Sequence, residues 1–123
     1  TFEINKKIKK EKSKKKIYFT LAHSKKSFLL FKKNDKTFWE SLWIPYDNQN
    51  LKKSNIFKEP YKSEVKNLNH ALSHIDLDIT IEIFDYKKPF KIETNLEHQW
   101  INKNQIDKFG LPKPIKTIIE NYV

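Results

Sequence analysis

Hydrophobic and polar residues alternate near the start of the chain in a way that predicts a β-hairpin. Ile17, Phe19 and Leu21 occupy every second position, as expected for a strand with one buried face. A polar stretch over residues 23–26 follows, and the apolar run Ser27–Phe31 comes directly after it. Two short apolar segments separated by a polar turn indicate two antiparallel strands.

The longest alternation in the chain extends from Ile75 to Ile83. Isoleucine or leucine occupies each odd-numbered position, and the even-numbered positions include Asp76, Asp78 and Glu82. This pattern is typical of a long antiparallel-type strand with one buried and one mostly wet face. The preceding residues, 67–74, are expected to form a neighbouring strand or an entry loop. Because the carboxylates repel phosphate, a polyanion should approach the other face or the beginning of the strand.

The last third of the chain changes from strand to helix. Residues 98–101 predict a short strand, and a helical turn is expected over residues 104–109, ended by Gly110. A terminal helix is predicted from Pro112 to Tyr122, because its apolar residues have the spacing of one helical face: Ile115, Ile118, Ile119 and Tyr122. The polar segment 47–61 is expected to be a loop. Strands early and helices late indicate the α+β class.

Length and charge suggest one compact domain preceded by a basic segment. The 123 residues suffice for one core, and eight lysines lie between Lys6 and Lys16 against the single Glu11. We therefore expect a basic linker over residues 1–15, either a solvated tether or an arm along DNA, and a domain over residues 16–123. The net charge of +10 favours phosphate-rich partners. Every basic residue is lysine, however, a bias also typical of AT-rich genomes.

Cysteine is absent, which excludes disulfides, thiolate zinc sites and cysteine-ligated iron–sulfur clusters within these residues. A metal site would need to draw on the four histidines, His23, His70, His74 and His98. Their spacing makes this the minority interpretation, and we expect no metal. No apolar run is long enough to cross a bilayer, so we expect an intracellular, soluble protein with no membrane partner.

Three segments, in this order and at this separation, resemble the C-terminal domain of the adenine DNA glycosylases of the MutY family. Residues 38–45 (FWESLWIP) resemble the family segment G-L-W-x-G-L-W-x-F-P, and residues 70–77 (HALSHIDL) resemble the signature H-x-F-S-H-x-x-L. Residues 100–119 resemble the closing tryptophan segment and the (Gly/Ala)-L-P-x-P-(Ile/Val) motif. Thr37 and Ser41 replace the glycines of the first motif, and Leu72 replaces the aromatic residue of the second.

The resemblance implies a fold and a parent enzyme. The fold would be a Nudix (MutT)-like mixed sheet with flanking helices, degenerate and without the Nudix box. The parent would be a bacterial, cytoplasmic enzyme of base excision repair that removes adenine opposite 8-oxoguanine. Its catalytic domain and 4Fe–4S cluster would lie in an N-terminal half outside this chain. This chain would then hold no catalytic residue and no cofactor, and its partners would be duplex DNA with the 8-oxoguanine:adenine mispair and that catalytic domain.

The resemblance places lesion contact at Leu72, Ser73 and His74, together with His70. In 8-oxoguanine N7 carries a hydrogen, whereas N7 of guanine only accepts, and a serine hydroxyl can either donate or accept. Ser73 would meet the altered edge, His74 the backbone, and Leu72 would act as an apolar wedge. The alternative is a polar turn whose leucine belongs to the core. Further candidate phosphate contacts are Lys66, Lys25 and Lys26.

Two other functions stay open. One is a stand-alone, degenerate Nudix-like hydrolase of oxidised nucleotides, although the chain has no R-E-x-x-E-E-x-G pattern and no two adjacent glutamates. The other is a protein-interaction module that docks a partner through Trp39, Trp43 and the lysine-rich arm. We expect both tryptophans, and Trp100, to be packing residues rather than base-stacking platforms.

Overall fold

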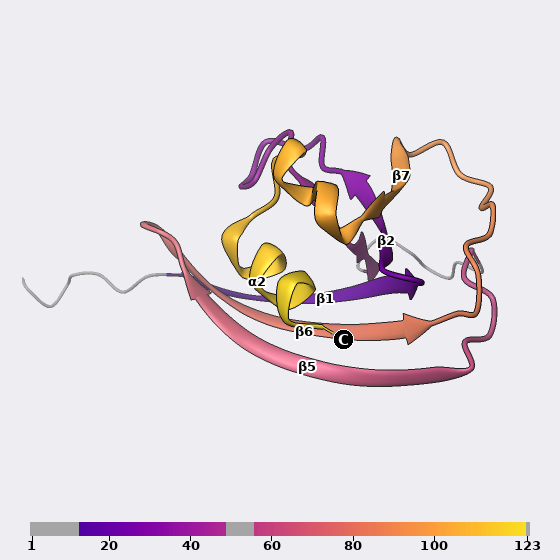
Figure 1. Cartoon of the computed structure of the whole chain (residues 1–123). Helices are drawn as coiled ribbons and strands as arrows, with labels where there is room; N and C mark the ends of the chain where they lie inside the picture. Colours follow the sequence, from indigo (N-terminus) through magenta and orange to yellow (C-terminus); the bar gives the residue numbers. More distant parts are fainter. Residues whose placement is uncertain (1–12, 49–55, 123) are drawn as a thin grey trace, which may run out of the picture.

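The computed structural model describes residues 13–48 and 56–122, which form a mixed sheet with few flanking helices (Figure 1). The sheet has seven strands, of which five follow the order β3-β2-β1-β6-β5. Outside this path, β4 pairs with β1 and β7 pairs with β2. The strands are β1 (Ser13–Ser24), β2 (Ser27–Lys32), β3 (Trp43–Ile44), β4 (Tyr46–Asp47), β5 (Lys62–Ala71), β6 (Ile75–Asp85) and β7 (His98–Asn102).

Three long strands, β1, β6 and β5, lie side by side in a curved layer (Figure 1). β6 is antiparallel to β5 but parallel to β1, with Ile79 opposite Ile17. The prediction of an antiparallel-type strand is therefore right for one edge of β6 and wrong for the other. Alternation shows which residues are buried and not which strand lies alongside. The neighbouring strand β5 also begins at Lys62, earlier than the predicted Asn67.

The main core lies between this layer and the C-terminal helix α2 (Lys113–Asn121), which covers one face of β1 and β6 (Figure 1). The buried row of β6 packs there with Ile115 and Ile119 of α2, both fully buried. Each such isoleucine contributes about 1.5 to 3 kcal/mol through its removal from water. Proline in the first turn of α2 costs no hydrogen bond, because the amides there have no partner within the helix.

A second, smaller core lies on the opposite face of β1 and β2. Its buried members are Ala22, Leu29, Phe31, Tyr86 and Ile92. Trp100 packs against this cluster and donates its indole N–H to the Phe90 carbonyl oxygen at 2.9 Å. The two cores together explain why four consecutive residues are buried in each strand, residues 19–22 of β1 and residues 28–31 of β2, since both faces of the strands are covered there.

The strands and helices that the sequence predicts locally are confirmed. The hairpin consists of β1 and β2, the short strand over residues 98–101 is β7, and the terminal helix is α2. The helical turn expected over residues 104–109 is the 3₁₀ helix η2 (Lys103–Lys108). The mixed-sheet α+β class expected from the sequence is confirmed by the structure.

Two predicted segments fall partly outside the described residues. Residues 13–15 of the expected basic linker belong to β1, whereas residues 1–12 lie outside the description. The expected loop over residues 47–61 begins within β4, and its residues 49–55 likewise lie outside. No helix in the described part is long and apolar enough to cross a membrane.

Candidate nucleic-acid interface

The turn between β5 and β6, residues 72–74, presents two polar side chains to solvent. Ser73 and His74 are exposed, whereas Leu72 is half-buried and packs against the main core. The Leu72 amide donates to the Ile75 carbonyl oxygen at 2.8 Å, which closes the turn. A hydroxyl and an imidazole, each able to donate or accept hydrogen bonds, are thus held at the end of a long hairpin.

Aromatic rings from the connection between β2 and β3 support the hairpin beside this turn. The Trp39 ring lies 6.0 Å from the His70 ring and 5.2 Å from the Phe38 ring. Trp43 is buried within the main core, which confirms that it is a packing residue. Trp39 is half-buried against the same core, so it packs on the protein and also touches the hairpin that carries the turn.

The backbone that carries Trp39 has an unfavourable conformation. The φ angles of Trp39 and Ser41 are 58° and 71°, in the left-handed region that costs a residue with a side chain roughly 1 to 2 kcal/mol. Ser41 stands where the resembled motif has glycine, the residue for which this region carries no penalty. Tertiary contacts hold the loop in place, among them a hydrogen bond of 2.8 Å from the Ser41 amide to the Lys33 carbonyl oxygen.

Asp35 fastens the same loop. Its carboxylate contacts the ammonium group of the buried Lys33, and it accepts hydrogen bonds from the Thr37 hydroxyl at 2.7 Å and the Thr37 amide at 3.1 Å. The pKa of Asp35 is lowered to about 2. The contact with Lys33 is the largest cause, and the hydrogen bond from the Thr37 hydroxyl is the second. Lys33 also lies 4.6 Å from the centre of the Phe38 ring, so this polar cluster adjoins the aromatic support.

An open groove of about 480 Å³ lies beside the turn. Its lining mixes charge and polarity: Lys14, Asn69, His70, Ala71, Asp76, Leu77 and Asp78. The parallel register places Lys14 opposite Asp76 and Lys16 opposite Asp78. These lysines offset the carboxylates that we expected to repel phosphate, so the repulsion on this face is weaker than the sequence of β6 alone suggests.

The structure does not bring all the predicted DNA-contact residues together. Leu72, Ser73 and His74 adjoin His70, which lies in β5 just before the turn. Lys66 lies in the middle of β5, where it forms an ion pair with Glu64 at 3.1 Å. Lys25 and Lys26 form the turn between β1 and β2, and the register of β1 along β6 places them at the opposite end of the sheet.

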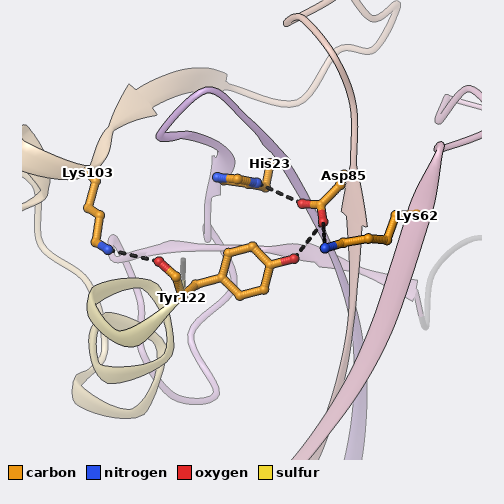
Figure 2. Close-up of polar contacts among 5 residues, drawn as sticks. All are labelled: His23, Lys62, Asp85, Lys103 and Tyr122. Carbon is orange, nitrogen blue, oxygen red and sulfur yellow. Dashed lines mark hydrogen bonds and ion pairs between the residues drawn. The ribbon is translucent and has the colours of Figure 1, made fainter.

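A buried polar network, which sequence reasoning missed, lies at that opposite end (Figure 2). The Asp85 carboxylate accepts a hydrogen bond from the Tyr122 hydroxyl at 2.7 Å and lies 2.7 Å from Nδ1 of His23. Lys62 approaches the same carboxylate at 3.7 Å, and Lys103 donates to the Tyr122 carbonyl oxygen at 2.9 Å. Burial, followed by the bond to Asp85, raises the pKa of Tyr122 above its ordinary value.

The sequence contains a signal for this network. Asp85 continues the odd-numbered row of β6 by one further step after Ile83, so a charged residue stands where the pattern places a buried one. A buried carboxylate requires partners, because desolvation without them costs several kcal/mol. The partners come from β1, β5 and the residue after α2, and alternation within one strand does not reveal them.

Comparisons with known proteins agree with this architecture. A search of curated protein sequences finds no match. Among solved structures, the chain is similar to the MutT protein of Methanosarcina mazei Go1, with 16% identity over 91% of this chain and 94% of that one and a TM-score of 0.59. It is also similar to the Ap4A hydrolase of C. elegans, with 12% identity over 85% and 92% of the two chains and a TM-score of 0.62.

A third similar structure is the C-terminal domain of mouse MUTYH, solved in complex with human PCNA. The identity is 8% over 85% of this chain and 84% of that one, with a TM-score of 0.60. At these identities the likenesses concern the fold. The family profile described as the NUDIX domain matches residues 17–121, from the buried start of β1 to the end of α2. The chain therefore belongs to the Nudix domain family.

Proposed function

We propose that the chain is the noncatalytic lesion-recognition domain of an adenine DNA glycosylase, which helps its parent enzyme find 8-oxoguanine opposite adenine. The observation that carries the proposal is the exposed turn with Ser73 and His74 at the end of the β5–β6 hairpin. Its sequence is also the segment that resembles the signature of the MutY family. The likeness to the mouse MUTYH domain supports the fold that this role requires.

Recognition would depend on hydrogen bonds rather than on catalysis. The Ser73 hydroxyl can accept a hydrogen bond from N7–H of 8-oxoguanine, a donor that guanine lacks. His74, beside it, is suited to the sugar–phosphate backbone. Leu72 packs against the main core, and in this proposal it anchors the turn; its role as a wedge in the base stack stays a prediction. His70 would hold the hairpin against Trp39.

The residues that the structure describes do not fit the magnesium chemistry of Nudix hydrolysis. That chemistry needs several carboxylates converging on the metal and a diphosphate. The sequence has no two adjacent glutamates, and residues 13–48 and 56–122 include no group of three or more side chains placed to hold a metal ion. We accordingly place the parent's chemistry, and its iron–sulfur cluster, in a separate catalytic domain that would be the second partner of this chain besides DNA.

Binding to matched duplexes tests the proposal. The chain should bind a duplex with 8-oxoguanine opposite adenine more tightly than one with guanine opposite adenine. Ser73→Ala should lower this preference roughly fivefold, the factor that corresponds to one hydrogen bond of about 1 kcal/mol. Ser63→Ala, which removes an exposed hydroxyl near the start of β5, is the matched control and should leave the preference unchanged.

Two results would argue against this role. Equal binding of both duplexes by the unaltered chain would remove the basis for lesion recognition. Magnesium-dependent turnover of 8-oxo-dGTP by the purified chain would instead support the alternative of a degenerate Nudix-like hydrolase.

A further inference from the structure

Lysines gather at the end of the sheet opposite to residues 72–74. Backbone hydrogen bonds and strand pairing bring together four segments here: the β1–β2 turn, the start of β5, the residues after β6 and the residue after β7. We call this region the basic end, and we define it by the six lysines that these segments carry: Lys25, Lys26, Lys62, Lys87, Lys88 and Lys103.

Little negative charge opposes these lysines. Asp85 is buried and bound to Tyr122 and His23, as Figure 2 shows. Two further acidic residues lie nearby: the exposed Glu59, and the half-buried Glu64, which is paired with Lys66 at 3.1 Å. Within the described residues, the ammonium groups of Lys25, Lys26 and Lys88 have no ion-pair partner. Positive charge therefore predominates on this surface.

The β1–β2 turn has a backbone that does not suit its residues. Ser24 pairs with Ser27, so Lys25 and Lys26 alone make the turn, with φ angles of 48° and 71°. Asn-Gly is the favoured pair for such a turn, because both positions are left-handed. Two lysines there cost stability, and unfavourable backbone conformations persist most often where a function requires the side chains. Both lysines are exposed.

The length of β6 sets the separation between the basic end and the turn at residues 72–74. Its eleven residues, from Ile75 to Asp85, span roughly 35 Å along the strand at about 3.3 Å per residue. One helical turn of B-form DNA is of similar length, about 34 to 36 Å. This is a length along a curved strand (Figure 1), so the straight separation is at most about one helical turn, and a single duplex is long enough to reach both regions.

We propose that the basic end binds the phosphate backbone of duplex DNA, independently of the lesion. The inference rests on the proposed function, because it takes DNA as the partner. It adds that two separate regions of the chain contribute base recognition and general affinity. The turn at residues 72–74 would distinguish the oxidised base, and the basic end would supply affinity through release of counterions from phosphate.

The double variant Lys25→Asn/Lys26→Gly tests this inference without endangering the fold. It removes two positive charges and introduces the residues that the left-handed turn prefers, so the hairpin should be at least as stable. We expect the slope of log K against log salt to become less negative by about 2, and the affinity for the undamaged duplex to fall roughly tenfold or more. The ratio of affinities for the lesion and guanine duplexes should not change.

Lys108→Gln/Lys113→Gln is the matched control. It removes the same charge from exposed positions in η2 and at the start of α2, and it should change the slope by much less. Equal slopes for the Lys25/Lys26 variant and the unaltered chain would overturn the inference. So would a variant that keeps its DNA slope but loses binding to vesicles of phosphatidylserine and phosphatidylcholine, because the basic end would then belong to a membrane surface.

The two proposals fail separately. If Ser73→Ala leaves the lesion preference intact, the proposed recognition fails, yet a reduced salt slope in the Lys25/Lys26 variant still supports the basic end. If the slope is unaffected while Ser73→Ala lowers the preference, only the inference about the basic end fails.

Discussion

The two ends of β6 differ in how far their polar groups are buried. At the Asp85 end, side chains from β1, β5 and the residue after α2 meet around one buried carboxylate (Figure 2). At the Ile75 end, the chain turns in solvent, and the Trp39 ring supports the hairpin beside the turn. Buried hydrogen bonds are costly to break, whereas exposed ones exchange readily with water. The Asp85 end thus stabilises the fold through buried polar groups, whereas the Ile75 end presents polar side chains on an exposed turn.

The largest expected effect is at the Asp85 end. Asp85→Ala should lower the free energy of unfolding by about 3 kcal/mol, because the Tyr122 hydroxyl and the His23 ring lose their acceptor within the protein. Urea unfolding measures this change. Asp107→Ala breaks an exposed ion pair with Lys116 at 2.8 Å and should leave the free energy nearly unchanged. Similar losses in the two variants would show that the network does not fasten the fold.

At the Ile75 end, substitution of Trp39 should affect both recognition and stability. Trp39→Ala should lower the preference for 8-oxoguanine about fivefold, since the hairpin loses its ring contact with His70, and it should cost about 1 to 2 kcal/mol of stability. Trp39→Phe should retain most of the preference. Tyr18→Ala, which removes an exposed ring from β1, serves as the control. An unchanged preference in Trp39→Ala would mean that the ring does not position the turn.

A smaller effect is expected from the backbone near Trp39. Ser41→Gly should stabilise the chain by about 0.5 to 1 kcal/mol, because glycine relieves the left-handed conformation at φ 71° although it gains freedom in the unfolded chain. The same exchange in an extended strand, Ser63→Gly in β5, should instead destabilise the chain by about 0.5 to 1 kcal/mol. Thermal unfolding of both variants measures the difference, and a loss in both would contradict the strain at Ser41.

The smallest effect is the acid dependence of the loop that holds Trp39. The pKa of Asp35 is lowered from 3.8 to about 2, so the carboxylate stabilises the loop fully above pH 3.8, and this contribution is lost as the pH falls through 2. Because Asp35 is exposed, solvent screening keeps the contribution small. An NMR titration of the carboxyl carbon should find a midpoint near 2, and the Trp39 indole signal should shift over the same range. A midpoint near 3.8 would mean that the pKa of Asp35 is not lowered, and hence that the Lys33 contact does not stabilise its carboxylate.

Most of the individual strands and the terminal helix were predictable from the sequence. The alternation from Ile17 to Leu21 and from Ile75 to Ile83 predicted the central strands, and the spacing from Ile115 to Tyr122 predicted α2. Local periodicity is sufficient here, because each element buries one face, and the period of that face is a property of the element itself.

The candidate interface was predictable only in part. The resemblance singled out residues 70–74, and the structure shows Ser73 and His74 exposed there. The support from Trp39 was not predictable, because it joins two segments that are distant in sequence and depends on a left-handed backbone at a residue that rarely adopts one. The separation of Lys25 and Lys26 from Ser73 likewise follows from strand pairing and not from composition.

The sequence by itself determined which positions are buried in each strand and in α2, since apolar side chains leave water wherever the fold places them. Tertiary structure alone decided that β1 runs parallel to β6, that Asp85 meets His23 and Tyr122, and that lysines collect at one end of the sheet. The physical reason is that pairing and register are fixed by the burial of all strands at once, whereas an alternating pattern describes one strand at a time.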